Sequence, residues 1–142
     1  LLLLLTALIA TVLGLIPPEV LIESTKFKGE YWALDDTGTR VVLKPQGDLW
    51  TIIPNPRGNL IKPVRSHVPG FVQCDGVDEQ LTIGDGKDIF WKIGLPIYDF
   101  PVAIQSSSNP GLFANANSGL GVICGKDETQ RWIIIPLLRE KN

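Results

Sequence analysis

Residues 130–136 read QRWIIIP, and two earlier stretches have the same form: DLWTIIP at 48–54 and IFWKIGL at 89–95. Their tryptophans, Trp50, Trp91 and Trp132, are separated by 41 and again by 41 residues. The same two intervals separate Gly29, Gly70 and Gly111, and no gap is needed to align residues 28–54, 69–95 and 110–136. A fixed period of this length indicates three copies of one structural unit. We expect these tryptophans and glycines to form the structural core of the repeat.

The repeat predicts the organisation of the chain. Three units of 41 residues, 20–60, 61–101 and 102–142, account for everything except residues 1–19. The 14 Gly and 11 Pro separate short runs rich in Val, Ile and Thr, which favours an all-β domain. Each unit then has about four short strands, and the stretch GDGKD (84–88) is predicted to be a tight hairpin turn with a positive φ. In the third unit the expected strands are Val102–Gln105, Leu112–Ala116, Leu120–Cys124 and Arg131–Pro136.

Three four-stranded units, each with a tryptophan near its end, resemble a β-trefoil. That family has a barrel of six strands closed at one end by three hairpins, arranged around a pseudo-threefold axis. Closure removes exposed sheet edges, which suits a small domain. The resemblance covers residues 20–142.

The first sixteen residues, up to Ile16, have no charged side chain. This favours an apolar N-terminal helix or leader over residues 1–19, interpreted as the remnant of a secretory signal peptide, and a secreted protein. The alternative is a membrane anchor that is retained. The net charge of −2 and the pI of about 5.3 give no electrostatic footprint for nucleic acid.

Groups that could carry out catalysis are scarce. His67 is the one histidine and lies in a loop, so no catalytic triad or metal site is expected, and neither is a cofactor. The protein is therefore predicted not to be an enzyme. Cys74 and Cys124 fall at inward or half-buried strand positions; a disulfide between them is open to a secreted chain, and the sequence leaves the pairing undecided.

The triplet Gln130-Arg131-Trp132 has the Gln-x-Trp form of ricin B-type lectins, and this resemblance implies a sugar site in the third unit. Asn115 falls where those lectins have an early acid, and it aligns with Ala33 and Cys74. A buried amide needs a hydrogen-bond partner, supplied by a ligand, by Gln130 or by the backbone. The residues expected to bind ligand are Asn115, Asn117 and Gln130. Against this site, residues 119–125 (GLGVICG) have no aromatic ring for a sugar to stack on, and in such families the Gln and Trp mainly tie the hairpin to the core.

Fungal and plant trefoils that inhibit proteases offer a second reading. Arg57 in PNPRGN (54–59) and Arg65 in KPVRSHVP (62–69) lie in proline-flanked loops, and stiff loops lose less entropy on binding. Tyr98 and Phe100 in GLPIYDFP (94–101) are candidate contacts for a protein or glycan partner. A third reading is a membrane-anchored structural or assembly subunit. The favoured prediction is a non-enzymatic, secreted, carbohydrate-binding β-trefoil that acts through its third repeat.

Overall fold

The computed structural model describes residues 16–137. In this range the chain forms thirteen strands and no helix, which confirms the predicted all-β class. The strands are β1 (Glu19–Ser24), β2 (Tyr31–Leu34), β3 (Val41–Lys44), β4 (Trp50–Ile53), β5 (Leu60–Pro63), β6 (Phe71–Gln73), β7 (Thr82–Gly84), β8 (Trp91–Ile93), β9 (Pro101–Val102), β10 (Ile104–Ser106), β11 (Phe113–Ala116), β12 (Val122–Gly125) and β13 (Trp132–Pro136).

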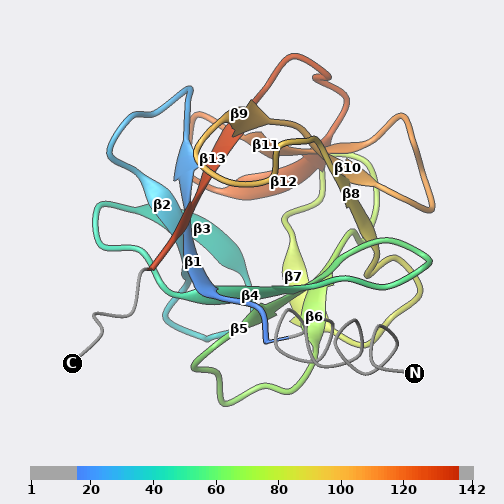
Figure 1. Ribbon diagram of the computed structural model, residues 1–142, viewed down its shortest axis with the longest axis horizontal. Coiled ribbons are helices and arrows are strands. Elements are labelled where there is room, and N and C mark those ends of the chain that lie inside the picture. Colours follow the sequence, from blue (N-terminus) through green and yellow to red (C-terminus); the bar gives the residue numbers. More distant parts are fainter. Residues whose placement is uncertain (1–15, 138–142) are drawn as a thin grey trace, which may run out of the picture.

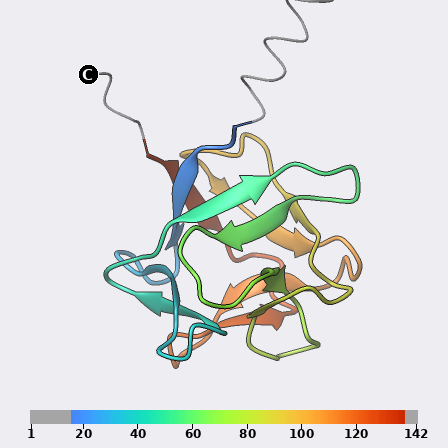
Figure 2. The same cartoon turned by 90° about the horizontal axis from the view of Figure 1, so that it is seen from below.

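Every strand pairing is antiparallel, and the pairs fall into three connected groups. One sheet runs β3-β2-β1-β13-β9, with β4 and β5 attached through β1; a second runs β12-β11-β10-β8; β6 and β7 form a third. Isolated bridges such as Val42↔Gly121 and Gln80↔Ile123 link these groups. The hairpins β2–β3, β6–β7 and β11–β12 lie at one end of the molecule, and β1 begins and β13 ends at the other (Figures 1 and 2).

The expected strands of the third unit are found with small shifts. The first is divided into β9 and β10 at Ala103, and the other three correspond to β11, β12 and β13 within two residues. The strands follow the alternation of buried and half-buried residues that a sheet with one face on a core requires, as in β1, where every second residue is buried.

The core is built around four tryptophans, each almost completely buried. Three of them, at the 41-residue spacing, each donate a hydrogen bond from the indole Nε1 to a backbone carbonyl 18 or 19 residues earlier in the chain. Trp50 donates to Trp32 O at 3.1 Å, Trp91 to Val72 O at 2.9 Å and Trp132 to Ala114 O at 2.9 Å. The fourth ring, Trp32, meets Trp50 and Trp132 edge to face, with ring centroids 5.8 and 5.4 Å apart.

Two sequence predictions need correction. The repeated glycines Gly29, Gly70 and Gly111 lie in surface loops and not in the core, and only the first two have a positive φ. The segment GDGKD, 84–88, is not a hairpin turn: none of its residues has a positive φ, and it connects β7 to β8, which belong to different sheets. Strand β7 ends in one sheet and β8 begins in another, so no tight turn is needed here.

Most of the predicted leader, residues 1–15, lies outside the described residues; β1 begins at Glu19, beside the predicted start of the first repeat. Between residues 16 and 137 no helix is long and apolar enough to cross a membrane.

Candidate functional site

The position aligned at Ala33, Cys74 and Asn115 is filled by a different residue in each unit. All three residues are buried, directly after or within the first strand of a hairpin. Cys74 forms a disulfide, Asn115 holds a neighbouring loop, and Ala33 has a side chain too small to do either. The three units therefore offer three different surfaces at the same place.

Asn115 is 3% exposed, and its amide is used by the protein itself. Its Nδ2 donates to Asp127 O at 2.9 Å and to Ala114 O at 3.1 Å, while its Oδ1 accepts from Asp127 N at 3.0 Å. The partner that a buried amide requires is thus the backbone, one of the alternatives that the sequence left open. Whether Asn115 also takes part in ligand binding stays a prediction.

Gln130 fixes the same hairpin from the other side. Its Oε1 accepts from Ala116 N at 2.7 Å, so the Gln-x-Trp triplet holds β11 through both its first and its third residue. Asp48, at the equivalent position of the first unit, accepts from Leu34 N at 2.7 Å. In both units a side-chain oxygen two residues before the tryptophan therefore accepts a hydrogen bond from the strand N–H. Gln130 and Asn115 have no hydrogen bond to each other; both contact Asp127.

Asp127 is the residue of this cluster that sequence reasoning missed. Its exposed carboxylate accepts from the backbone N–H and the hydroxyl of Thr129, at 3.0 and 2.6 Å, and from Gln130 Nε2 at 3.3 Å. These hydrogen bonds, that of the Thr129 hydroxyl foremost, lower the pKa of Asp127 below its usual value. A carboxylate thus lies beside Gln130, although Asn115, at the position where ricin B-type lectins have their early acid, is an amide.

Asn117, the third predicted ligand residue, shapes a turn. Its Oδ1 accepts from Gly119 N at 3.0 Å and Gly121 N at 2.9 Å, the local pattern for which Asn is favoured in turns. The side chain is half-buried. In the third unit, therefore, all three predicted ligand residues also make hydrogen bonds that hold the β11–β12 hairpin.

An open hollow lies in the first unit, where Ala33 takes the place of Asn115. It measures about 540 Å³, within the range of small-ligand sites, which is about 300–1,000 Å³. Asp48 accepts from Leu34 N through Oδ2, and its Oδ1 has no hydrogen-bond partner within residues 16–137. The hollow is lined by Ala33, Lys44, Pro45, Gln46, Gly47 and Asp48. These residues align, 82 positions apart, with Asn115 and residues 126–130 of the third unit.

The hollow can donate and accept hydrogen bonds, because its lining includes an ammonium, an amide and a carboxylate. No aromatic residue lines it. No sequence signal marks this hollow, since its lining residues form no recognisable motif.

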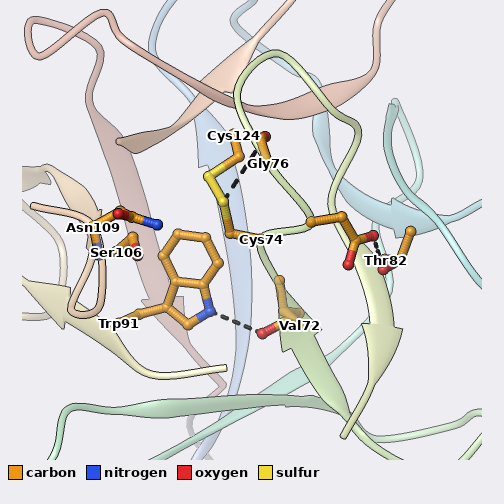
Figure 3. The surroundings of a disulfide bond; sticks show 9 residues. Val72, Cys74, Gly76, Thr82, Trp91, Ser106, Asn109 and Cys124 are labelled. Carbon is orange, nitrogen blue, oxygen red and sulfur yellow. Dashed lines mark hydrogen bonds between the residues drawn. A yellow bond between two sulfur atoms is a disulfide. The ribbon is translucent and has the colours of Figure 1, made fainter. Parts of the chain in front are cut away.

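The second unit is closed at this position by the disulfide Cys74–Cys124, whose Cα atoms are 5.6 Å apart (Figure 3). It joins the end of β6 to β12 and so connects the second unit to the third. Both cysteines are buried, and no free cysteine remains in the described chain. The open question of their pairing is thereby answered.

The loop residues predicted for protein contacts differ in exposure. Arg57 and Arg65 are exposed; Arg57 lies in a turn closed by a hydrogen bond from Gly58 N to Asn55 O at 2.9 Å. Their role as inhibitory residues stays a prediction. Phe100 is exposed as expected, whereas Tyr98 packs against the core, and this burial raises the pKa of its hydroxyl. The sequence reading missed Leu95, which is 87% exposed.

Among residues 16–137, no group of three or more His, Cys, Asp or Glu side chains is placed to hold a metal ion. His67 is exposed on the loop after β5.

Known proteins resemble this chain in structure only. No protein-family model matches it, and neither does any curated protein sequence. Lysenin in complex with phosphocholine superposes with a TM-score of 0.71 at 16% identity, covering 90% of this chain and 47% of lysenin. The lysenin pore gives a TM-score of 0.71 at 15% identity, with 87% and 48% covered. The chain thus spans about half the length of lysenin.

A salivary protein from Culex quinquefasciatus, of a family rich in cysteine and tryptophan, matches over nearly its whole length. The TM-score is 0.70 at 12% identity, and the match covers 85% of this chain and 94% of that one. At these identities the likeness establishes the fold alone. The chain has an all-β, β-trefoil-like fold.

Proposed function

We propose that this protein is a non-enzymatic, extracellular, carbohydrate-binding module. The observation that carries the proposal is the hollow beside Ala33, with Lys44, Gln46 and Asp48 in its lining. Sugar hydroxyls both donate and accept hydrogen bonds, so a site with a cation, an amide and a carboxylate suits them. The β-trefoil-like fold supports the proposal at a coarse level.

The third unit provides a second polar surface, at the position that the sequence favoured. Asp127 keeps an exposed carboxylate next to Gln130. In this proposal Asn115, Asn117 and Gln130 hold the β11–β12 hairpin, and Asp127 and Thr129 present the groups that a sugar would contact. The first and third units would then bind through the same face of equivalent hairpins.

An extracellular location is part of the proposal. The buried disulfide Cys74–Cys124 needs an oxidising compartment to form, and cytosolic proteins rarely keep such bonds. One of the structurally similar proteins is a salivary protein.

A glycan array with the full chain tests the proposal, and phosphocholine conjugates belong on it because lysenin was solved with that group. Lys44→Ala with Gln46→Ala is expected to abolish binding if the first unit carries the site, because both residues line the hollow. Asp127→Asn tests the third unit in the same way. Arg57→Ala is the matched control, since this exposed residue lies in the turn between β4 and β5. The proposal would be refuted if neither a glycan nor a conjugate bound above background.

A further inference from the structure

The three most exposed large apolar side chains among residues 16–137 lie toward the end of the molecule where β1 begins and β13 ends. Leu95 is 87% exposed, Ile16 71% and Phe100 58%, and Leu137 is also exposed. Single exposed apolar residues are ordinary, but a cluster of them marks an interaction surface. We name Ile16, Leu95, Phe100 and Leu137 the apolar end.

Backbone hydrogen bonds place the loop that carries Leu95 and Phe100, and the start of β1, beside β13. Asp99 N, in the loop with Leu95 and Phe100, donates to Ile134 O at 2.9 Å. Leu137 N donates to Glu19 O at 2.9 Å, and Pro136 pairs with Val20. The loop 94–100 and the start of β1 therefore flank the same strand end, as Figure 2 also shows.

The loop is held so that these side chains face outward. Ile97 and Tyr98 pack against the core, while Leu95 and Phe100, on either side of them, remain exposed. Gly94 N donates to Ala103 O at 3.2 Å, which ties the start of the loop to the strand that follows. A surface fixed in this way loses little conformational entropy on binding.

Charge is sparse in the loop 94–101 at this end, although Glu19 lies at the start of β1. Asp99 is the one charged residue among residues 94–101. The hairpin end is more polar, since the first-unit hollow and the Asp127 cluster both lie there. The two ends therefore differ in the kind of partner that they fit.

We propose that the apolar end docks on the surface of a lipid bilayer, with Leu95 and Phe100 entering its interfacial region. The first sixteen residues of the chain have no charged side chain and join the domain at Ile16, within the apolar end. The apolar part of a bilayer could accommodate this uncharged sequence together with Leu95 and Phe100. Aliphatic and aromatic side chains enter the boundary between headgroups and acyl chains. Since the loop has no cation, zwitterionic lipid suffices.

This orientation points the hairpin end away from the membrane, so that the hollow and the Asp127 cluster stay open to solvent. The proposal does not depend on carbohydrate binding.

The test uses the full chain with an environment-sensitive fluorophore on a single introduced cysteine and with phosphatidylcholine vesicles. Leu95→Cys and Phe100→Cys report on the apolar end. Val77→Cys, at a site 47% exposed beyond β6, and Gln46→Cys in the hollow are the matched controls. Labelling needs no reductant, because the native cysteines are paired. Near-ultraviolet circular dichroism verifies the fold of each variant.

On addition of vesicles, the labels at 95 and 100 are expected to shift to the blue and to escape quenching by aqueous iodide, while those at 77 and 46 do not change. Shielding at 95 before lipid is added would overturn the proposal: if it depends on protein concentration, a second copy covers the loop, and otherwise another part of the chain does. The proposal also fails if the protein does not bind vesicles, or if it binds while 95 and 100 stay quenched. A shift at 46 instead would mean that the hairpin end faces the lipid.

Discussion

The side-chain amide of Asn115 and the backbone of Asp127 form a reciprocal pair of hydrogen bonds, at 2.9 Å from Nδ2 to O and 3.0 Å from N to Oδ1. The two residues are twelve positions apart, on opposite sides of β12 in sequence. Because Asn115 is almost fully buried, this pair fixes the loop that carries Asp127 to the core.

Asn115→Ala is therefore expected to lower the free energy of unfolding by about 2 kcal/mol, since it removes the three hydrogen bonds of a buried amide and leaves the backbone N–H and C=O of Asp127 without these partners. Urea denaturation measures the change. Asn55→Ala is the matched control: its side chain accepts from Arg57 N in an exposed turn, so it should cost a few tenths of a kcal/mol at about the level of surface substitutions. Equal stability of both variants would show that Asn115 is free for another purpose.

Gln130 and Asp48 are expected to contribute equally to stability, each in its own unit. Gln130→Ala and Asp48→Ala each remove an acceptor from a strand N–H, of Ala116 and Leu34 respectively, at a cost of about 1 kcal/mol. Hydrogen exchange of those two amides should accelerate, each in its own variant only. Glu128→Ala and Gln46→Ala, two residues earlier, change exposed side chains and should leave both amides protected.

Much of this arrangement could be predicted from the sequence, because it rests on local spacing. The interval of 41 residues located the three tryptophans and the ends of most strands in the third unit, since one aligned position predicts the others. The pairing of Asn115 with Asp127 could not be predicted, because a buried amide states only that a partner exists. The hollow beside Ala33 could not be predicted either, because a small apolar residue in a strand indicates only an ordinary core position. Exposure of Leu95 depends on how its loop lies, and the sequence does not contain that information.

The four tryptophans should differ in what their ring nitrogen contributes. Trp32 Nε1 is buried and has no hydrogen-bond partner in the described part of the chain, whereas Trp91 Nε1 donates to Val72 O. Trp32→Phe and Trp91→Phe lose similar ring area, but only the second breaks a hydrogen bond. We expect Trp91→Phe to be less stable than Trp32→Phe by about 1 kcal/mol or more in thermal or urea unfolding. The reverse order would mean that Trp32 Nε1 binds an ordered group.

The disulfide is expected to be a major source of stability. Its cysteines are 50 residues apart, and a cross-link of that span reduces the entropy of the unfolded chain by an amount worth about 4 kcal/mol at 25 °C. Cys74→Ala/Cys124→Ala should lose about this much in urea. Because both cysteines are buried, dithiothreitol should reduce the bond slowly in the native protein and quickly in denaturant. Equally fast reduction in both conditions would contradict the burial.

Asp127 should contribute to the loss of stability at low pH, and the hydrogen bonds from Thr129 should set the pKa at which it does so. The Thr129 hydroxyl and N–H, followed by Gln130, lower the pKa of Asp127 below 3.8 in the folded protein. A carboxyl whose pKa is lower when folded stabilises the fold above its unfolded pKa of about 3.9, and this contribution is lost as pH falls through the folded value. The window therefore lies below about pH 4. An NMR titration of the Asp127 side-chain carboxyl should show its pKa rising in Thr129→Ala and staying low in Thr129→Ser, which keeps the hydroxyl.

Asp35 provides an internal reference: burial raises its pKa, but hydrogen bonds from Thr37 and from the backbone of Arg40 and Thr39 outweigh this and lower it. Since none of those groups touches Thr129, the pKa of Asp35 should be the same in both variants. A pKa of Asp127 that does not respond to Thr129→Ala would remove Thr129 as its cause.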